Sequence, residues 1–199
     1  MRFRPITSST DTSSVAANTQ MILDRYEMGE WQFASLNLRG TNLRETRLPG
    51  LNLILADLIG ADLSLIHWSG SNLVEACLTG ALLWRANLRS SALIRTNLTR
   101  SILIHAELAQ TDCHQALFAY ADMRLIDCTH ADLTEADFVG ADLRFANLAG
   151  ANLAGANLTG ANLTGANLSG ADLYGANLCG ARIERVNWTD CDRYHAKFA

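Results

Sequence analysis

The chain has 199 residues, of which 49% are hydrophobic and 18% are charged, and its formal net charge is −4. With this mildly acidic balance we expect no direct binding to nucleic acid. A membrane-spanning helix is excluded, because the most apolar region, 51–68, contains Asp57 and Asp62.

Residues 1–17 are rich in Ser and Thr and poor in apolar side chains, so we expect a disordered tail. The segment lacks the apolar core of a secretory signal, which favours a cytoplasmic location. An organelle transit peptide is the alternative, because Arg2 and Arg4 precede any acidic residue.

Residues 18–30 form the next unit, in which the apolar spacing becomes helical. Ile22 and Tyr26 fall on one helical face, and Gly29 suits the residue after a helix end. We therefore expect a capping helix over 19–28, laid across the open end of the repeat that follows.

From 31 to 199 a five-residue pattern runs without interruption. Its centre falls on every fifth position from Phe33 to Phe198, thirty-four in all, and twenty-three of these are Leu. Positions two before the centre are mostly Ala, Ser or Thr, and Gly stands two after the centre in thirteen units. Each unit thus has one large and one small inward residue two positions apart, which is the spacing of side chains on one face of a strand. Gly permits the positive φ that a tight turn requires. The pattern predicts an all-β solenoid, whose coils are stable only when stacked.

The repeating unit resembles the pentapeptide repeat family. In its purest stretch it reads Ala151-Asn152-Leu153-Ala154-Gly155. The resemblance spans 31–199 and implies a right-handed quadrilateral β-helix of about eight coils, with four units per coil and a length of about 40 Å at the ~4.8 Å strand spacing. Segment 22–33 also resembles the N-terminal caps of cyanobacterial members, which implies that the helix covers the first coil.

A filled rod offers no convergent pocket, so we expect no enzymatic activity, no catalytic residue, no cofactor and no metal site. The Asp residues that precede many centres are interpreted as a solvated position where Asn and Asp interchange. The five cysteines include no CxxC pair and are interpreted as structural thiols. Three fall on inward positions and two on outward ones: Cys113, Cys128 and Cys191, then Cys77 and Cys179.

One outer face differs from the others. Adding twenty to a residue number moves one coil along the same face, so outward residues can be grouped by face. On this face large apolar and Arg side chains replace small polar ones, and we call these ten residues the decorated face: Leu65, Leu82, Trp84, Arg85, Ile102, Ile104, Arg124, Leu125, Arg144 and Phe145. Exposed apolar stripes mark partner sites, and Trp and Arg are frequent in binding hot spots. The sequence predicts a non-enzymatic scaffold or regulator that binds another protein there.

Three further hypotheses stay open. The outward aliphatic side chains could simply stack and support the sheet. Quinolone-resistance members of the family bind DNA gyrase as acidic mimics of DNA, so a topoisomerase modulator is the second functional hypothesis, although the acidic positions between Asp112 and Asp142 encircle the rod. The basic last coils, with Trp188 and Phe198, close the C-terminal end themselves or pair with a second copy as a homodimer.

Overall fold

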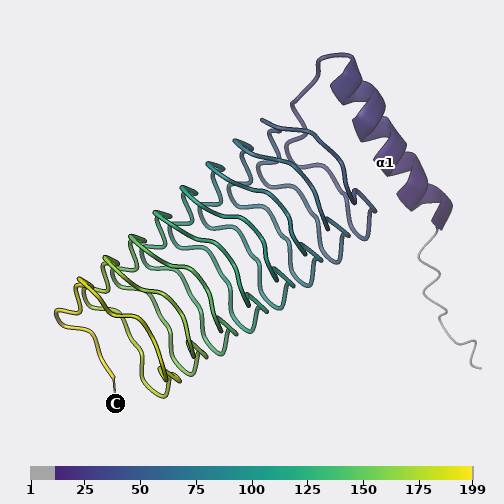
Figure 1. Cartoon of the computed structure of the whole chain (residues 1–199). Helices are drawn as coiled ribbons and strands as arrows, with labels where there is room; N and C mark the ends of the chain where they lie inside the picture. Colours follow the sequence, from purple (N-terminus) through teal and green to yellow (C-terminus); the bar gives the residue numbers. More distant parts are fainter. Residues whose placement is uncertain (1–11, 199) are drawn as a thin grey trace, which may run out of the picture.

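The computed structural model describes residues 12–198, with side chains from Thr19 onward. One helix, α1 (Thr12–Glu27), is followed by a rod of stacked coils. In the rod every fifth residue from Gln32 to Lys197 forms an isolated parallel β-bridge to the residue twenty positions away. Four units therefore make one coil, and each strand is reduced to a single bridged residue. Figure 1 shows the coils stacked along one axis, with α1 across the first of them. The expected right-handed quadrilateral β-helix is confirmed.

Each unit bonds to the coils on both sides. The amide of Leu38 donates to the carbonyl of Asp57 at 2.7 Å, and the amide of Asp57 donates back to the carbonyl of Leu36 at 2.9 Å. Between two centres a tight turn closes, as where the amide of Ala56 donates to the carbonyl of Leu53 at 3.0 Å. Since most of these bonds join neighbouring coils, stability belongs to the stack and not to a single unit.

The Asn or Asp before each centre caps the turn that follows. Asn52 Oδ1 accepts the amide of Ile54 at 3.2 Å, and Asp172 Oδ1 accepts that of Tyr174 at 2.8 Å. This Asx hydrogen bond explains why amide and carboxylate interchange at the position. The interpretation of these residues as merely solvated was incomplete, because they stabilise the corners.

The interior is a continuous column of repeat centres separated by small residues. Every centre from Phe33 to Leu178 is at most 4% exposed. Large centres stack on one another, as the rings of Phe118 and Phe138 do at 5.0 Å between centroids. Cys113 and Cys128 are buried in this column, as their place in the repeat predicts.

Helix α1 closes the N-terminal end of the column. Ile22 is buried against the coils, and the Arg25 guanidinium lies 4.8 Å from the ring centroid of Phe33. The Tyr26 hydroxyl donates to the carbonyl of Pro49 at 3.1 Å. A second hydrogen bond runs from Thr19 Oγ1 to the carbonyl of Asn42 at 2.9 Å, and Met21 and Leu23 also pack against the core. The cap is thus fixed by apolar packing, a stacked cation and hydrogen bonds to the first coils.

The helix is longer than its sequence pattern indicates. It begins at Thr12 instead of Thr19, so residues 12–17, expected to be disordered, are helical. Val15 and two following alanines can continue a helix at small cost, even beside Ser and Thr. Residues 1–11 of the expected tail lie outside the described residues. At the other end the prediction is close: α1 ends at Glu27, and Gly29 follows with a φ of +84°.

Trp31 does not join the first apolar layer, although it stands at the inward position two before the first repeat centre. Phe33 is buried and Leu36 is partly buried against the core, but Trp31 is 56% exposed. Its position two before a centre holds Ala, Ser or Thr in most coils, and an indole is too large for that inward space.

Candidate functional site

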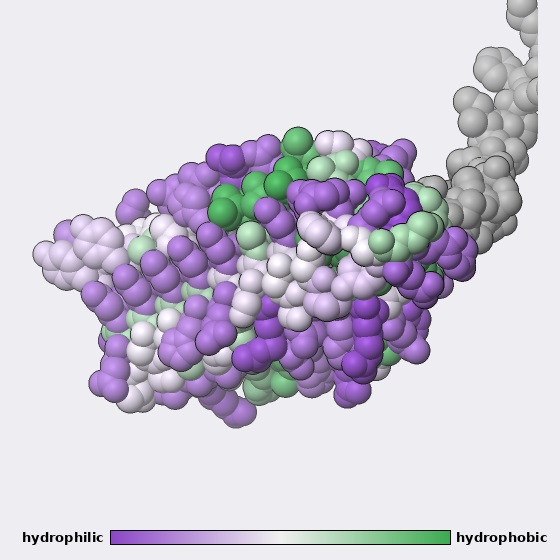
Figure 2. Space-filling view, turned by 90° about the horizontal axis from the view of Figure 1, so that it is seen from above, coloured by the Kyte–Doolittle hydropathy of each residue, from purple (hydrophilic) through white to green (hydrophobic). Residues whose placement is uncertain are grey.

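The decorated face lies on one side of the rod. A column of parallel bridges joins Asp62, Leu82, Ile102, Asp122 and Asp142 in successive coils. The remaining residues of the face follow this column at the next outward positions of the same units. In the view of Figure 2 the largest hydrophobic area of the surface lies over the middle of the rod and the half nearer α1.

Two residues of this face have no side-chain oxygen to cap the turn that follows them. Leu82 and Ile102 stand where Asn or Asp normally accepts the corner amide, and they are 39% and 37% exposed. An apolar side chain at this place neither caps the turn nor enters the core. Leu117, Cys77 and Ala92, on other faces, also occupy this position without a capping oxygen. The stacking alternative accounts for contact between Leu82 and Ile102, but not for the loss of the caps.

The corners of the central coils are strained. The third residue of each turn has a positive φ, and between Gly80 and Gly140 eleven successive corners are occupied by residues other than glycine. A left-handed conformation costs a residue with a Cβ roughly 1–2 kcal/mol. Such strain persists where the side chain has a use, so it points to the coils between 85 and 135.

Phe145 and Tyr120 are the two aromatic residues at positive-φ corners of the described rod, and Phe145 is the one on the decorated face. From 140 to 180 it is the one residue at a corner that is not glycine, with a φ of +57°. An aromatic side chain at positive φ is a genuine outlier. Phe145 is 60% exposed, so burial does not offset the strain.

Five residues of the decorated face line one shallow open groove of about 250 Å³: Ile104, Arg124, Leu125, Arg144 and Phe145. Ile104 contributes an aliphatic wall, while Leu125 and Phe145 project from the same corner of two successive coils. The two Arg side chains lie between them on successive coils. The groove therefore combines apolar walls with fixed hydrogen-bond donors.

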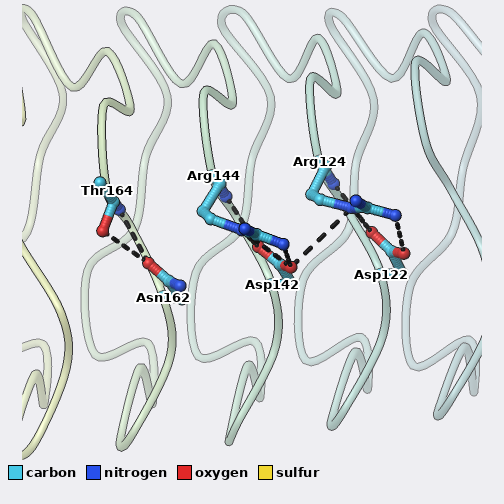
Figure 3. Close-up of polar contacts among 6 residues, drawn as sticks. All are labelled: Asp122, Arg124, Asp142, Arg144, Asn162 and Thr164. Atoms are coloured by element: carbon cyan, nitrogen blue, oxygen red, sulfur yellow. Dashed lines mark hydrogen bonds and ion pairs between the residues drawn. The ribbon is translucent and has the colours of Figure 1, made fainter.

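Each Arg of the groove is held by the Asp two residues before it. Arg124 donates through Nε and Nη2 to the two carboxylate oxygens of Asp122, both at 2.8 Å. Arg144 does the same to Asp142 at 2.9 and 2.7 Å. Figure 3 shows both pairs in the same arrangement one coil apart, with Asn162 and Thr164 at the equivalent place in the next coil. Bidentate pairing fixes the orientation of both guanidinium planes.

The pKa values of these groups follow from the pairing. Partial burial acts to raise the pKa of Asp142, but hydrogen bonds from Arg144 and the charges of Arg144 and Arg124 outweigh it, so the pKa is lowered. The hydrogen bond to Asp122 raises the pKa of Arg124, and that to Asp142 raises the pKa of Arg144. Asp142, Arg124 and Arg144 are therefore charged at neutral pH.

The other half of the decorated face lies outside the groove. Leu65 and Trp84 are half-buried, and the Arg85 guanidinium lies 4.8 Å from the ring centroid of Trp84. Leu82 and Ile102 occupy the column beside them. The structure thus divides the ten residues into an apolar half with one cation and a groove with two Arg–Asp pairs.

A second hollow was not predicted from the sequence. It has a volume of about 390 Å³ and lies at the junction of the cap and the first coil, lined by Tyr26, Gly29, Glu30, Trp31, Pro49 and Gly50. The exposed indole of Trp31 was the one signal that could have indicated it.

Among residues 12–198 no group of His, Cys, Asp or Glu is arranged to hold a metal ion. Over the same range, α1 is too short and too polar to cross a bilayer, and it is the sole helix described there.

Comparisons with known proteins agree with this architecture. The family model for pentapeptide repeats matches eight copies, over residues 37–65, 85–112, 111–148 and 146–185. No curated protein matches the chain.

Three solved structures are similar to the chain. A trypsin-treated QnrB1, a plasmid-mediated fluoroquinolone resistance protein, is 19% identical with a TM-score of 0.66, over 84% of this chain and 89% of that chain. HetL, involved in heterocyst differentiation regulation in the cyanobacterium Nostoc, is 31% identical over 88% and 94% with a TM-score of 0.33. Rfr23 from the cyanobacterium Cyanothece is 21% identical over 92% and 99% with a TM-score of 0.19. The likeness to QnrB1 concerns the fold alone. Because the family model covers well over half of the chain, this protein belongs to the pentapeptide repeat family.

Proposed function

We propose that this protein is a non-enzymatic scaffold or regulator that binds another protein through the decorated face. The observation that carries the proposal is Phe145, an exposed aromatic side chain in a strained corner that lines a groove. Strain without burial is costly for the folded chain alone, so a gain on binding is the simplest account of it. The exposed apolar side chains of Leu82 and Ile102 support the same face.

Coils beyond this face provide a natural comparison. From 150 to 180 all corners are glycine, and outward side chains are mostly Asn, Thr, Ser and Ala. These coils keep the same core and the same backbone bonds. We therefore infer that they act as a spacer, while contact is made between 82 and 145.

The proposal is tested by affinity capture from the native organism. The double variant Trp84→Ala with Ile104→Ala removes outward side chains and leaves the core intact. It should lose a partner that wild-type protein captures, while Thr159→Ala with Tyr174→Ala, on the bare coils, should retain it. Equal capture by all three proteins would show that the face is wrongly assigned.

The competing hypothesis is a modulator of DNA gyrase. Mimicry of DNA needs an acidic column along one face. The longest such column, Asp112, Asp132, Asp172 and Asp192, is interrupted by Asn152. On the decorated face Asp122 and Asp142 are each neutralised by Arg. A gyrase supercoiling assay separates the hypotheses, because the scaffold proposal expects no inhibition by the purified protein.

Self-association through the last coil is a further part of the proposal. In that coil the centres Ile183 and Phe198 are 37% and 42% exposed, and Arg193 lies 5.3 Å from the ring centroid of Trp188. A second copy could cover these side chains. Sedimentation velocity over a wide range of concentrations should show a dimer, and a monomer at the highest concentration would contradict this part alone.

A location in a reducing compartment such as the cytoplasm also belongs to the proposal. All five cysteines, which lie within the described residues, are thiols. Disulfides form and persist mainly in oxidising compartments, so this pattern favours the cytoplasm.

A further inference from the structure

The groove of the decorated face holds unused hydrogen-bond donors. A guanidinium carries five N–H groups, and in both Arg124 and Arg144 only Nε and one N–H of Nη2 are bonded to Asp. In the part of the chain that the structure describes, the Nη1 groups of both residues have no protein acceptor. Asp122 and Asp142 already fix the planes of the two guanidinium groups. The loss of conformational entropy when a ligand bonds to Nη1 is therefore small.

The local charge is opposite to that of the whole chain. Between Leu82 and Phe145 the outward residues of this face include three Arg and two Asp, a surplus of one positive charge, whereas the chain carries −4. The surplus is Arg85, which stacks on Trp84 and makes no ion pair among residues 12–198. A surplus this small, beside two carboxylates, is poorly suited to a phosphate backbone, whose binding depends on many cations. It suits a protein segment with a few carboxylates.

We propose that the partner binds here through an acidic segment, which places one apolar side chain in the groove and carboxylates on the neighbouring Arg residues. The apolar side chain packs between Ile104, Leu125 and Phe145. The carboxylates accept hydrogen bonds from the Nη1 groups of Arg124 and Arg144 and approach Arg85. This inference rests on the proposed function and adds the chemistry of the partner.

The experiment is a selection of random twelve-residue peptides displayed on phage, with the full chain immobilised. Peptides that bind wild-type protein should carry an apolar residue flanked by Asp or Glu. One selected peptide is then synthesised with a fluorescent label, and its affinity is measured by anisotropy. Phe145→Ser should weaken binding, while Thr164→Ala, at the equivalent outward position of Arg144 one coil further along, should not change it.

Charge variants give the sharpest readout, because two substitutions should act in opposite directions. Arg124→Gln with Arg144→Gln should weaken the affinity for the peptide about tenfold or more, since charge-assisted hydrogen bonds are lost. Asp122→Asn with Asp142→Asn keeps the Asx caps, as Asn52 and Asn162 do elsewhere. It also removes two carboxylates that repel an acidic segment, and we expect this gain to exceed the loss of fixed guanidinium orientation. This second variant should bind the acidic peptide more tightly than wild type.

The possible outcomes distinguish the acidic partner from the proposed binding face on which it rests. Selected peptides that are neutral or basic, yet lose binding in Phe145→Ser, would overturn the acidic partner and leave the face in place. No selected peptide, or peptides that bind Phe145→Ser as well as wild type, would overturn both. A selected sequence that matches an acidic outward column of this same chain would identify a second copy as the partner and contradict a separate acidic protein.

Discussion

The ring of Phe145 covers Gly165, the residue at the same corner one coil further along the rod. A Cβ built on Gly165 would lie 2.7 Å from two carbons of that ring. Tyr120 is related to Gly140 in the same way, with ring carbons at 2.7 and 2.8 Å. Large corner side chains therefore lean toward the C-terminal end, and the glycine that follows leaves room for them.

Gly165→Ala should destabilise the protein more than Gly160→Ala does. Both positions have positive φ, +72° and +66°, so both variants carry the left-handed strain of about 1 kcal/mol. At Gly160 no atom lies within 4 Å of the new Cβ, whereas at Gly165 the ring of Phe145 must move. Urea unfolding measures the difference, which we expect to be about 0.5–1 kcal/mol for two residues in contact.

The control for this prediction is the same pair of variants in a Phe145→Ala background. Without the ring, the two alanine substitutions should become equally destabilising. If the difference persists in that background, the ring does not rest on Gly165 as described.

Arg100→Gly should stabilise the rod. Arg100 lies at a central corner with a φ of +57° and an exposed side chain. Relief of the left-handed strain, roughly 1–2 kcal/mol, exceeds the roughly 0.5–1 kcal/mol that glycine adds to the entropy of the unfolded chain. We expect a gain of up to about 1 kcal/mol in the free energy of unfolding, measured by calorimetry. Arg100→Ala keeps the strain and should give no gain; an equal gain from both would refute the explanation.

Cys113 and Cys128 should resist thiol reagents in the folded protein. Burial raises the pKa of Cys113 to about 12, and it also raises that of Cys128. Thiolate, the reactive form, is therefore scarce at both sites. Mass spectrometry after alkylation at pH 8 should find Cys77 and Cys179 modified and both buried thiols untouched until urea is added. Rapid alkylation of Cys113 without denaturant would mean that the central coils open readily.

Stability should decline in acid partly through Asp142. Its pKa in the folded protein lies below the ordinary value of 3.8. The contribution of the carboxylate is therefore complete above about pH 4 and is lost as pH falls through the lowered pKa. The contribution is small and sensitive to salt because both side chains are still partly in contact with solvent.

Thermal melting between pH 2 and pH 7 tests this point. Asp142→Asn should flatten the acid side of the profile relative to wild type. Asp172→Asn, on a turn without a paired Arg, is the matched control. Profiles of equal slope for wild type and Asp142→Asn would contradict a role for the Arg144 pair.

Much of the fold could be predicted from the sequence, because a solenoid repeats one local backbone structure. The Leu centres and the small residues before them determine the interior of every coil. The structure of one unit therefore predicts that of all thirty-four units. The cap was less predictable: the start of α1 depends on weak helix propensities, and the outward turn of Trp31 depends on the space left in the first coil.

The residues of the decorated face could be identified from the sequence by their spacing of twenty positions, but their geometry could not. Sequence spacing does not show that Asp122 and Asp142 bind Arg124 and Arg144 bidentately, since that depends on rotamers. Nor does it show that five of the ten residues line a groove. The positive φ at Phe145 could be inferred from the glycines at equivalent corners, but the position of its ring over Gly165 could not.

The most direct test of the central claim is site-specific photo-crosslinking in the native host. A benzoylphenylalanine is placed at residue 104 in the decorated face, or at residue 164, the equivalent outward position three coils away. The account predicts that a partner protein is crosslinked from 104 and that none is crosslinked from 164. Crosslinks of equal yield from both positions, or from 164 alone, would contradict the assignment of the binding face.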